Sequence, residues 1–528
     1  YLLNHTHRHT HTHIHTHTHT KTKTKTKTKT KTKTKTKTKT KTKTKKGQRI
    51  LMERKQTATV NGAVARAAYA VRGELYLAAQ KRIESGKEVI ITNVGNPQAL
   101  GQPSFTFNRR VLALLTAPFL LQECPQLRDS MPEDVIERAS KYREMLSGGS
   151  VGAYTDARGL YGVREEVARF VEKRDSPFSK ASAEDIYLTN GASEAVAKVL
   201  QALLRGSHDC VLVPIPQYPL YSATVALMGG EVLPYHLDED RGWALDEHVL
   251  EEAVRGARAK GKTVRGMVVI NPGNPTGQCM GLGDLEKIVR FCSRENVVLL
   301  ADEVYQTNIY KAGTKFTSMR AVMNRLQPSG GLELISFHSA SKGAMGECGL
   351  RGGYVHFENV HDVFRREVYK LLSVSLSPNI IGNVTVGLMV NPPAQGQPSY
   401  ALHMEEKRQI LGALKRRAQR VAEVFNSCTG VTCTPTDGAL YSFPRVHLPA
   451  RAVAEAARLG KTPDTLYCLE LLAETGISTV PGAGFGQQDG TFHFRTTILV
   501  QESDLERVLA LFVRFHEGFM ARYASSKL

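Results

Sequence analysis

Between residues 185 and 342, short apolar runs rich in β-branched residues alternate with segments that have the spacing of amphipathic helices. The apolar runs lie at residues 185–188, 210–213, 266–270, 297–301 and 332–335. Runs without polar alternation predict strands buried on both faces, which is the pattern of a mainly parallel sheet covered by helices. Each run leads into a polar loop, and open α/β sheets bind ligands beyond the carboxyl ends of their strands. We therefore predict an α/β fold with its functional site in these loops.

The rest of the sequence divides the chain into further regions. Residues 1–50 contain a tract of His-Thr and then Lys-Thr dipeptides, which has little apolar surface to bury and is predicted to be disordered. Residues 51–131 are expected to form an N-terminal arm and part of a small domain, and residues 132–400 the large domain. Residues 401–528 are expected to complete the small domain and to begin with a long helix at about residues 401–427.

The composition argues against several classes of protein. The net charge of +20 describes mainly the tail, because residues 1–50 carry 14 Lys, two Arg and no acidic residue. Such a tail can bind nucleic acid non-specifically, but it has no interleaved aromatic residues for base stacking, so we expect no specific nucleic-acid partner. The eight cysteines are scattered without a Cys-x-x-Cys pair, which favours reduced intracellular thiols and predicts no metal site. The longest apolar stretch, residues 111–121, is too short to span a membrane. The chain begins at Tyr1, and we expect its natural start to lie closer to Met52.

Lys342 is the first candidate for a reactive residue. It follows the apolar run at residues 332–335 in a loop of small residues, and Arg351 lies nine residues further on with glycines on both sides. A lysine in such a loop can hold a carbonyl cofactor as a Schiff base, while the arginine binds a phosphate. The glycines would let the backbone approach the cofactor closely. The alternative is an ordinary solvated lysine.

Three further candidates lie where predicted strands end. Ala192 and Ser193 open a helix after a strand, where free N–H groups and a hydroxyl can bind an anion; the alternative is simple helix capping by Ser193. Asp302 ends a strand that should be central, and a buried carboxylate needs a partner such as a protonated pyridine nitrogen. An ordinary loop aspartate that caps a backbone N–H is the alternative for Asp302.

The remaining candidates are polar or aromatic side chains that suit a heteroaromatic cofactor and a carboxylate substrate. Tyr305 and Asn274 can donate to a phenolate oxygen, although the Asn-Pro-Thr-Gly run that contains Asn274 is also a common turn. Tyr218 can stack on a ring or pack in the core. Arg495 interrupts an alternating strand pattern and can bind a carboxylate with its two-pronged guanidinium, or lie on a surface edge strand. Together these groups match what pyridoxal phosphate needs.

On these motifs the chain resembles the class I, fold-type I pyridoxal-phosphate aminotransferases, and within them the alanine aminotransferase subgroup. The resemblance runs from about residue 65 to the C-terminus. The segments that carry it are 93–102, Ala153-Tyr-Thr-Asp-Ala-Arg-Gly-Leu160, Leu188-Thr-Asn-Gly-Ala-Ser193, Asn271-Pro-Gly-Asn-Pro-Thr-Gly-Gln278, Phe337-His-Ser-Ala-Ser-Lys-Gly343, Gly346-Glu-Cys-Gly349 and Phe492-His-Phe-Arg-Thr-Thr497. It implies a large domain with a mainly parallel sheet of the seven-stranded type between helices, and a smaller α/β domain built from both chain ends. The repeat tail has no counterpart in the family pattern.

The resemblance also implies a role for each candidate. Lys342 would hold pyridoxal phosphate as a Schiff base and move the proton at the substrate α-carbon. The residues implied to hold the cofactor ring are Asp302, Tyr305, Asn274 and Tyr218. The residues implied to hold its phosphate are Ala192, Ser193, Ser339 and Arg351. Arg495 would bind the substrate α-carboxylate with Gly95 nearby, and Tyr154 would reach the phosphate in the neighbouring subunit of a homodimer.

The activity implied by the resemblance is ping-pong transfer of the amino group of L-alanine to 2-oxoglutarate, giving pyruvate and L-glutamate. The partners are then small amino acids and 2-oxo acids, with no membrane, and we expect the enzyme in the cytoplasm, with the mitochondrion as the alternative. Two other functions stay open. One is a related enzyme that acts on aromatic amino acids, kynurenine or S-adenosylmethionine. The other is a non-catalytic regulator with an aminotransferase-like domain and the basic tail as its nucleic-acid-binding arm.

Overall fold

The computed structural model describes residues 60–68, 73–177, 180–328 and 331–524. The disorder predicted for residues 1–50 and the expected start near Met52 lie outside these ranges. The domain boundaries predicted at residues 131/132 and 400/401 stay predictions.

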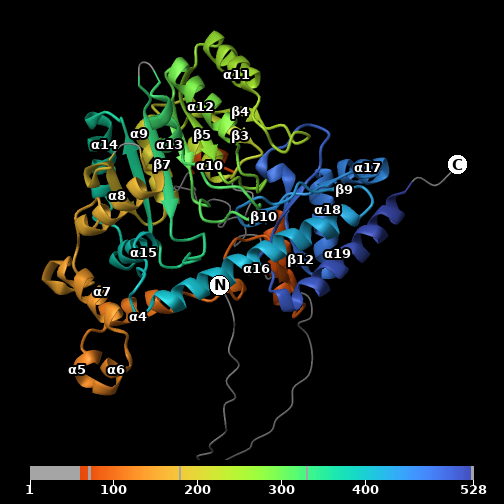
Figure 1. Cartoon of the computed structure of the whole chain (residues 1–528). Helices are drawn as coiled ribbons and strands as arrows, with labels where there is room; N and C mark the ends of the chain where they lie inside the picture. The colour runs from red at the N-terminus through yellow and green to blue at the C-terminus, as the bar shows by residue number, and fades with distance from the viewer. Residues whose placement is uncertain (1–59, 69–72, 178–179, 329–330, 525–528) are drawn as a thin grey trace, which may run out of the picture. The chain divides into compact units, whose positions relative to one another are not determined.

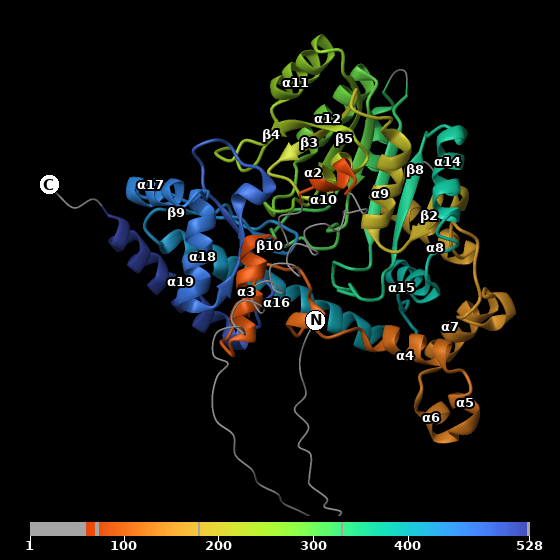
Figure 2. The same cartoon turned by 180° about the vertical axis from the view of Figure 1, so that it is seen from behind.

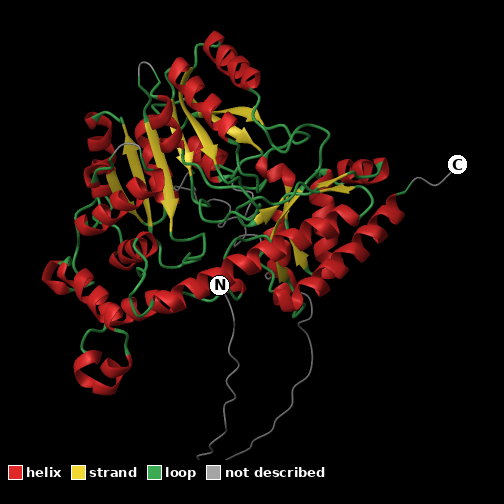
Figure 3. Ribbon diagram, in the orientation of Figure 1, coloured by secondary structure: helices red, strands yellow, loops and turns green. Residues whose placement is uncertain are grey.

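A seven-stranded sheet forms the centre of the larger α/β unit (Figure 1; strands are yellow in Figure 3). Its strands are β2 (Ile186–Thr189), β3 (Asp209–Ile215), β4 (Glu231–His236), β5 (Thr263–Ile270), β6 (Val298–Asp302), β7 (Leu334–Ser339) and β8 (Gly353–Glu358). The spatial order is β2-β8-β7-β6-β5-β3-β4, and only β8 runs antiparallel to its two neighbours. This arrangement confirms the predicted mainly parallel sheet.

Both faces of the sheet are covered by helices, as the continuous apolar runs predicted. One face packs against α8 (Tyr161–Asp175), α11 (Glu247–Ala259), α12 (Leu282–Glu295), α13 (Met319–Leu326) and α15 (Ile380–Val390). The other packs against α9 (Ala192–Leu203), α10 (Leu220–Leu227) and α14 (Asp362–Ser373), which are labelled in Figure 2. All residues of β3 are buried, because its side chains meet a helix layer on each face.

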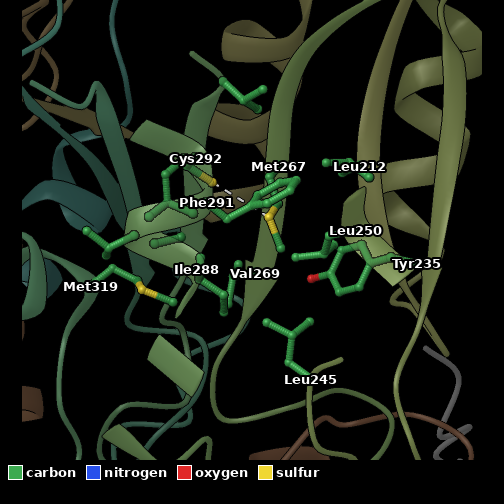
Figure 4. Close-up of a cluster of buried hydrophobic side chains, with 14 of the residues drawn as sticks. Leu212, Tyr235, Leu245, Leu250, Met267, Val269, Ile288, Phe291, Cys292 and Met319 are labelled. Atoms are coloured by element: carbon green, nitrogen blue, oxygen red, sulfur yellow. Dashed lines mark hydrogen bonds between the residues drawn. The ribbon is translucent and has the colours of Figure 1, made fainter. Parts of the chain in front are cut away.

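The packing between α12 and the sheet illustrates how the core forms. Figure 4 shows Ile288, Phe291 and Cys292 of α12 beside Met267 and Val269 of β5. The Cys292 Sγ lies 3.6 Å from the Met267 Sδ, and all five side chains are buried. Apolar residues spaced three and four apart place one stripe of the helix against the sheet, which is the pattern expected of a core-facing helix.

A smaller α/β unit joins both ends of the described chain. Its strands are β1 (Ile90–Ile91), β9 (Val431–Thr432), β10 (Tyr441–Ser442), β11 (Arg445–Val446), β12 (Ile477–Ser478), β13 (Val480–Pro481) and β14 (Phe494–Thr497). Its helices are α3 (Glu74–Glu84), α16 (Tyr400–Ser427), α17 (Ala450–Arg458), α18 (Pro463–Thr475) and α19 (Glu502–Tyr523). The parallel pairing of Ile90 with Ile477 brings an N-terminal strand against a C-terminal one, which confirms the small domain predicted from both chain ends.

Local sequence features explain where the observed elements differ from those predicted. Residues 440–446 form two short strands instead of one continuous strand, because β10 pairs with β14 and β11 pairs with β9, and Pro444 between them has no N–H to donate. Residues 125–151 are polar and mixed in composition and contain two α-helices. The helices of the segment between α3 and α8 are α4 (Thr106–Thr116), α5 (Leu120–Glu123), α6 (Pro125–Ser130) and α7 (Glu133–Glu144). Within residues 58–88 the described helices are α2 (Gly62–Arg66) and α3, and positions 58–59 and 69–72 lie outside the described residues.

Within the described ranges, no helix is both long enough and apolar enough to cross a membrane.

Candidate active site

A cavity of about 270 Å³ lies where β5, β6 and β7 end, between the sheet and the smaller α/β unit. We call it the active-site cavity. Ten of the predicted site residues line it: Gly95, Ala192, Ser193, Tyr218, Asn274, Asp302, Tyr305, Ser339, Lys342 and Arg351. A larger cavity of about 600 Å³ lies elsewhere, around Trp243 and Lys415, and none of the predicted residues lines that one. The topology thus brings the strand-end loops together, as expected for an open α/β sheet.

Lys342 lies in the loop after β7 and is half-buried. Its Nζ donates a hydrogen bond to the Gly95 carbonyl oxygen, which belongs to the loop after β1. A Cβ placed on Gly95 would lie 2.9 Å from Tyr441 Cζ and 3.2 Å from the Lys342 Nζ. The glycine therefore leaves the space that the lysine amine and the tyrosine occupy.

Asp302, at the end of β6, is buried, and the ion pairs among the described residues do not include it. Its Oδ2 accepts a hydrogen bond from the Tyr221 hydroxyl at 2.8 Å, and its Oδ1 accepts one from the Val304 N–H at 3.3 Å. Burial raises the pKa of the Asp302 carboxyl to about 6, although both hydrogen bonds lower it. The ionised form of such a buried carboxyl is stabilised by a cationic partner inside the cavity.

The titration of Asp302 predicts how stability depends on pH. In the cofactor-free chain its folded pKa of about 6 exceeds the ordinary value of 3.8, so folding favours the protonated form. The carboxyl then costs nothing below about pH 4 and destabilises the fold progressively as the pH rises to about 6, by on the order of 3 kcal/mol. Asp302→Asn should remove this cost, so its gain in the free energy of unfolding over the unaltered chain should grow between pH 4.5 and pH 7.

Urea unfolding of the cofactor-free proteins at both pH values measures this difference. Asp489→Asn, at an exposed position, is the matched control and should show no such growth. A gain that is the same at both pH values contradicts the burial argument.

Two tyrosines, Tyr305 and Tyr441, line the same cavity as Asp302. The Tyr305 hydroxyl donates to the Tyr441 hydroxyl at 3.3 Å, and the two rings are nearly perpendicular with centroids 6.0 Å apart. Burial, together with the neighbouring Tyr441, raises the pKa of Tyr305. Burial also acts to raise the pKa of Tyr441, but the charges of Lys342 and Arg495 and the hydrogen bond from Tyr305 outweigh it, so the pKa of Tyr441 is lowered.

The first turn of α9 and the loop before β8 form a cationic, N–H-rich wall. Gly191, the residue before α9, has φ 90°, which places Ala192 and Ser193 at the cavity. The Arg351 guanidinium donates to the carbonyl oxygens of Asn190 at 2.7 Å and Cys348 at 2.9 Å. Exposed N–H groups at a helix start beside an arginine bind anions well.

The end of β7 adds a hydroxyl to this wall. The Ser339 hydroxyl donates to the Gly352 carbonyl oxygen at 2.9 Å and accepts from the Ser341 N–H at 3.1 Å. That the glycines around Arg351 admit the cofactor stays a prediction, and Gly353 also serves chain packing, because a Cβ on it would lie 2.7 Å from the Ala192 nitrogen. Glycine here allows β8 to pack directly against the start of α9.

Arg495 lies on β14 in the smaller unit and not on the cavity wall, and it is only 2% exposed. It donates to Asn274 Oδ1 at 3.1 Å and to the Asn93 carbonyl oxygen at 2.7 Å, whereas its Nε has no hydrogen-bond partner. Its guanidinium carbon lies 4.2 Å from the centroid of the Tyr441 ring. Among the ion pairs of the described residues, none involves Arg495. A buried guanidinium without a carboxylate partner suits a carboxylate ligand.

Tyr154 is the second predicted residue, after Arg495, that does not line the cavity, and several lining residues were not predicted. Tyr154 is 72% exposed and does not line the cavity. The unpredicted lining residues include Asn96, Ser341, Cys348 and Tyr441. Ser341 and Cys348 stand within nine residues of Lys342, so proximity in sequence was the available signal. Tyr441 follows the buried Leu440, and no local pattern distinguishes it from a core tyrosine.

The comparisons with known sequences agree with one another. The family described as aminotransferase class I and II matches residues 123–512. Glutamate–glyoxylate aminotransferase 2 of Arabidopsis thaliana is 49% identical over 470 residues, which cover 89% of this chain and 97% of the relative. Alanine aminotransferase 1 of Homo sapiens is 44% identical over 478 residues, which cover 88% of this chain and 95% of the relative.

Solved structures show the same fold. An aminotransferase from Escherichia coli has a TM-score of 0.69 at 26% identity and covers 88% of this chain and 100% of its own. An alanine aminotransferase from Pyrococcus furiosus has a TM-score of 0.68 at 22% identity and covers 87% of this chain and 100% of its own, a likeness that concerns the fold alone. The family match and the curated relatives confirm the resemblance seen in the sequence motifs. The chain therefore belongs to the class I and II aminotransferases.

Proposed function

We propose that this chain is an alanine aminotransferase that uses pyridoxal phosphate and transfers the amino group of L-alanine to 2-oxoglutarate. The observation that carries the proposal is the convergence of an amine, a buried carboxylate and an anion-binding wall in one cavity. Relatives named alanine aminotransferase, 44% identical over about 88% of the chain, support the choice of substrate.

The residues present fit pyridoxal phosphate, which the class I aminotransferases use. Asp302 is a buried carboxylate whose raised pKa calls for a cationic partner, and the pyridine nitrogen of the cofactor is such a partner when protonated. The start of α9, Ser339 and Arg351 supply N–H and hydroxyl donors for a phosphate. Tyr218 would stack on the ring, and Tyr305 and Asn274 would hold its phenolic oxygen.

Pyridoxal phosphate supplies an aldehyde that condenses with amines and a ring that accepts electrons when a bond at the substrate α-carbon breaks. Lys342 Nζ is the amine that would hold the cofactor and later carry the α-proton. Its hydrogen bond to the Gly95 carbonyl keeps the amine inside the cavity. Asp302 would keep the pyridine nitrogen charged, and Arg495 would bind the substrate carboxylate and fix which α-carbon bond faces Lys342.

Tyr154 would act in a neighbouring subunit. Its side chain is 72% exposed and lies outside the cavity lining, which suits a residue that completes the phosphate site of a second copy in a homodimer. Sedimentation of the full chain tests the dimer, and weaker cofactor binding by Tyr154→Phe tests the contact.

The cytoplasm is the proposed compartment, and the mitochondrion is the alternative because the names of some relatives place them there, such as the probable alanine aminotransferase of Dictyostelium discoideum. Cell fractionation with an antibody to the chain distinguishes the two compartments.

A second candidate function is transfer from glutamate to glyoxylate. Two relatives named glutamate–glyoxylate aminotransferase, from Arabidopsis thaliana, are 49% identical, above the 41–44% of those named for alanine. The two functions differ in both the amino donor and the accepting 2-oxo acid, but each pairs an amino acid with a 2-oxo acid that carries the same α-carboxylate, so the same cavity residues serve both.

A matrix of amino donors and 2-oxo acids tests these proposals. The donors are alanine, glutamate, an aromatic amino acid, kynurenine and S-adenosylmethionine; the acceptors are 2-oxoglutarate, pyruvate and glyoxylate. Alanine with 2-oxoglutarate should give the highest kcat/KM, and a clear excess of glutamate with glyoxylate would favour the second function. Absence of cofactor absorbance and of turnover with every pair would reject both.

Gly95→Ala should lower kcat/KM by roughly tenfold or more. The added methyl would lie 2.9 Å from Tyr441 Cζ and 3.2 Å from the Lys342 Nζ, so one of these groups must move from its position in the cavity. Steady-state kinetics with alanine measure the effect. Gly349→Ala, in the loop after Lys342, is the control, because a Cβ there meets no atom within 4 Å. Equal losses in the two variants would contradict the steric argument.

A further inference from the structure

Tyr441 connects the two halves of the proposed active site. It lies on β10 in the smaller unit and is only 4% exposed. Its hydroxyl accepts a hydrogen bond from the Tyr305 hydroxyl, which belongs to the loop after β6 in the larger unit. Its ring covers the Arg495 guanidinium at 4.2 Å. One side chain thus contacts both a proposed holder of the cofactor ring and the proposed substrate-carboxylate binder.

The hydroxyl pair can change its hydrogen-bond direction. Each phenol has one proton to donate and can accept from others. Tyr305 now donates to Tyr441 at 3.3 Å, so it has no second proton for a cofactor oxygen. When Tyr305 donates to that oxygen, Tyr441 can become the donor to Tyr305. A phenol that accepts a hydrogen bond is itself a stronger donor, because hydrogen bonds in a chain polarise one another.

The ring of Tyr441 acts on Arg495. The guanidinium lies over two aromatic rings, with its carbon 4.2 Å from the Tyr441 centroid and 4.8 Å from the Phe485 centroid. Two hydrogen bonds, to Asn274 and to the Asn93 carbonyl, fix its nitrogens Nη1 and Nη2. Aromatic faces stabilise a desolvated cation and restrict its rotation. The orientation of the buried arginine therefore depends on both rings.

We propose that Tyr441 is a positioning residue with two separable parts: its hydroxyl supports Tyr305 as donor to the cofactor ring oxygen, and its ring orients Arg495 for the substrate carboxylate. This inference rests on the proposed use of pyridoxal phosphate. It assigns a role to a residue that the sequence motifs did not single out. The titratable and charged groups that face its hydroxyl are Tyr305, Lys342, Arg495 and Cys348. Their combined effect lowers the pKa of Tyr441, as expected for a phenol held against cations.

Three variants of the full chain, loaded with pyridoxal phosphate, separate the two parts. Tyr441→Phe removes the hydroxyl and keeps the ring. Tyr441→Leu removes both. Phe485→Leu removes the other ring over Arg495 and leaves the hydroxyl pair intact. Two quantities are measured for each: the pH midpoint of the bound cofactor's absorbance change, and the KM for alanine and for 2-oxoglutarate.

Tyr441→Phe should raise the pH midpoint by about 0.5 unit or more, because Tyr305 becomes a weaker donor, and should change each KM by less than about threefold. Tyr441→Leu should show the same rise and also raise each KM by roughly tenfold or more, because Arg495 loses an aromatic face. Phe485→Leu should raise KM without moving the midpoint. Circular dichroism verifies folding, and if Tyr441→Leu does not fold, the other two variants still test both parts.

An unchanged midpoint in Tyr441→Phe overturns the role of the hydroxyl. Unchanged KM values in Tyr441→Leu, or in Phe485→Leu if only that variant folds, overturn the role of the ring. If the unaltered chain binds no pyridoxal phosphate, the proposed function itself fails, and this result is distinct because it appears before any substitution is made.

Discussion

Lys342→Ala is expected to abolish transamination almost completely and to remove the absorbance of the cofactor bound through the lysine amine. The Nζ is the amine that reaches into the active-site cavity from the loop after β7, where it donates to the Gly95 carbonyl. Loss of a positioned proton carrier alone costs roughly 10²–10⁴-fold in rate, and loss of the covalent attachment adds to this. The change should appear in kcat, with the cofactor retained by its other contacts.

Three measurements on the purified variant check this expectation: the absorbance spectrum with added pyridoxal phosphate, the retention of cofactor after gel filtration, and the rate of pyruvate formation from alanine. Lys370→Ala is the matched control, because its side chain is 68% exposed and pairs with Glu367 on the surface. It should keep the spectrum and rate of the unaltered chain. Turnover by Lys342→Ala within tenfold of the unaltered chain would contradict the assigned role of the amine.

The central strands were predictable because their burial is encoded in short stretches of local sequence. β3, β5 and β6 contain continuous apolar runs, and such runs have few alternatives to a strand buried on both faces. β7 begins inside the run predicted at residues 332–335 and continues through a mixed segment to Ser339. β4 and β8 were not predicted. β4 is a partly exposed edge strand that contains Pro234, and β8 begins with glycine and mixes polar with apolar residues. Their strand form depends on pairing with a neighbour, which the local sequence does not specify.

The site was predictable to the extent that each residue stands at the end of its own element. Ser193 opens α9, Asp302 ends β6, and Lys342 follows β7, so a sequence pattern identifies them one by one. The contacts between units were not predictable. Tyr441 comes from β10, and its position over Gly95 and beside Tyr305 arises only when the two α/β units pack together. A motif can identify a residue, but only packing reveals which groups it orients.

Arg495→Leu is the second substitution for which we expect a large loss of activity. Arg495→Leu should raise the KM for alanine and for 2-oxoglutarate by about 30- to 4,000-fold, because removing one partner of a buried charged pair costs about 2–5 kcal/mol and each factor of ten corresponds to 1.4 kcal/mol. The guanidinium is 2% exposed, is held by Asn274 and the Asn93 carbonyl, and keeps one nitrogen, Nε, without a partner. Arg495→Lys should lose less, since it keeps the charge but not the two-pronged geometry.

Arg445→Leu is the matched control, because Arg445 lies in the same unit at 27% exposure and pairs with Glu239. It should change either KM by less than about threefold, the usual scale for a surface ion pair.

A substrate that lacks the carboxylate shows whether Arg495 acts on that group. The unaltered chain should convert alanine far faster than ethylamine, which is the same amine without the carboxylate. If Arg495 binds the carboxylate, then removing the arginine and removing the carboxylate delete the same interaction, and their combined effect should be much smaller than the sum of the two single effects. The measurement is the single-turnover rate of the unaltered chain and of Arg495→Leu, each with alanine and with ethylamine. The four rates form a thermodynamic cycle. Additive effects would mean that the arginine supports the fold of β14 and that the carboxylate is bound elsewhere. The rings of Tyr441 and Phe485, which lie against the Arg495 guanidinium, would then not orient it for the substrate.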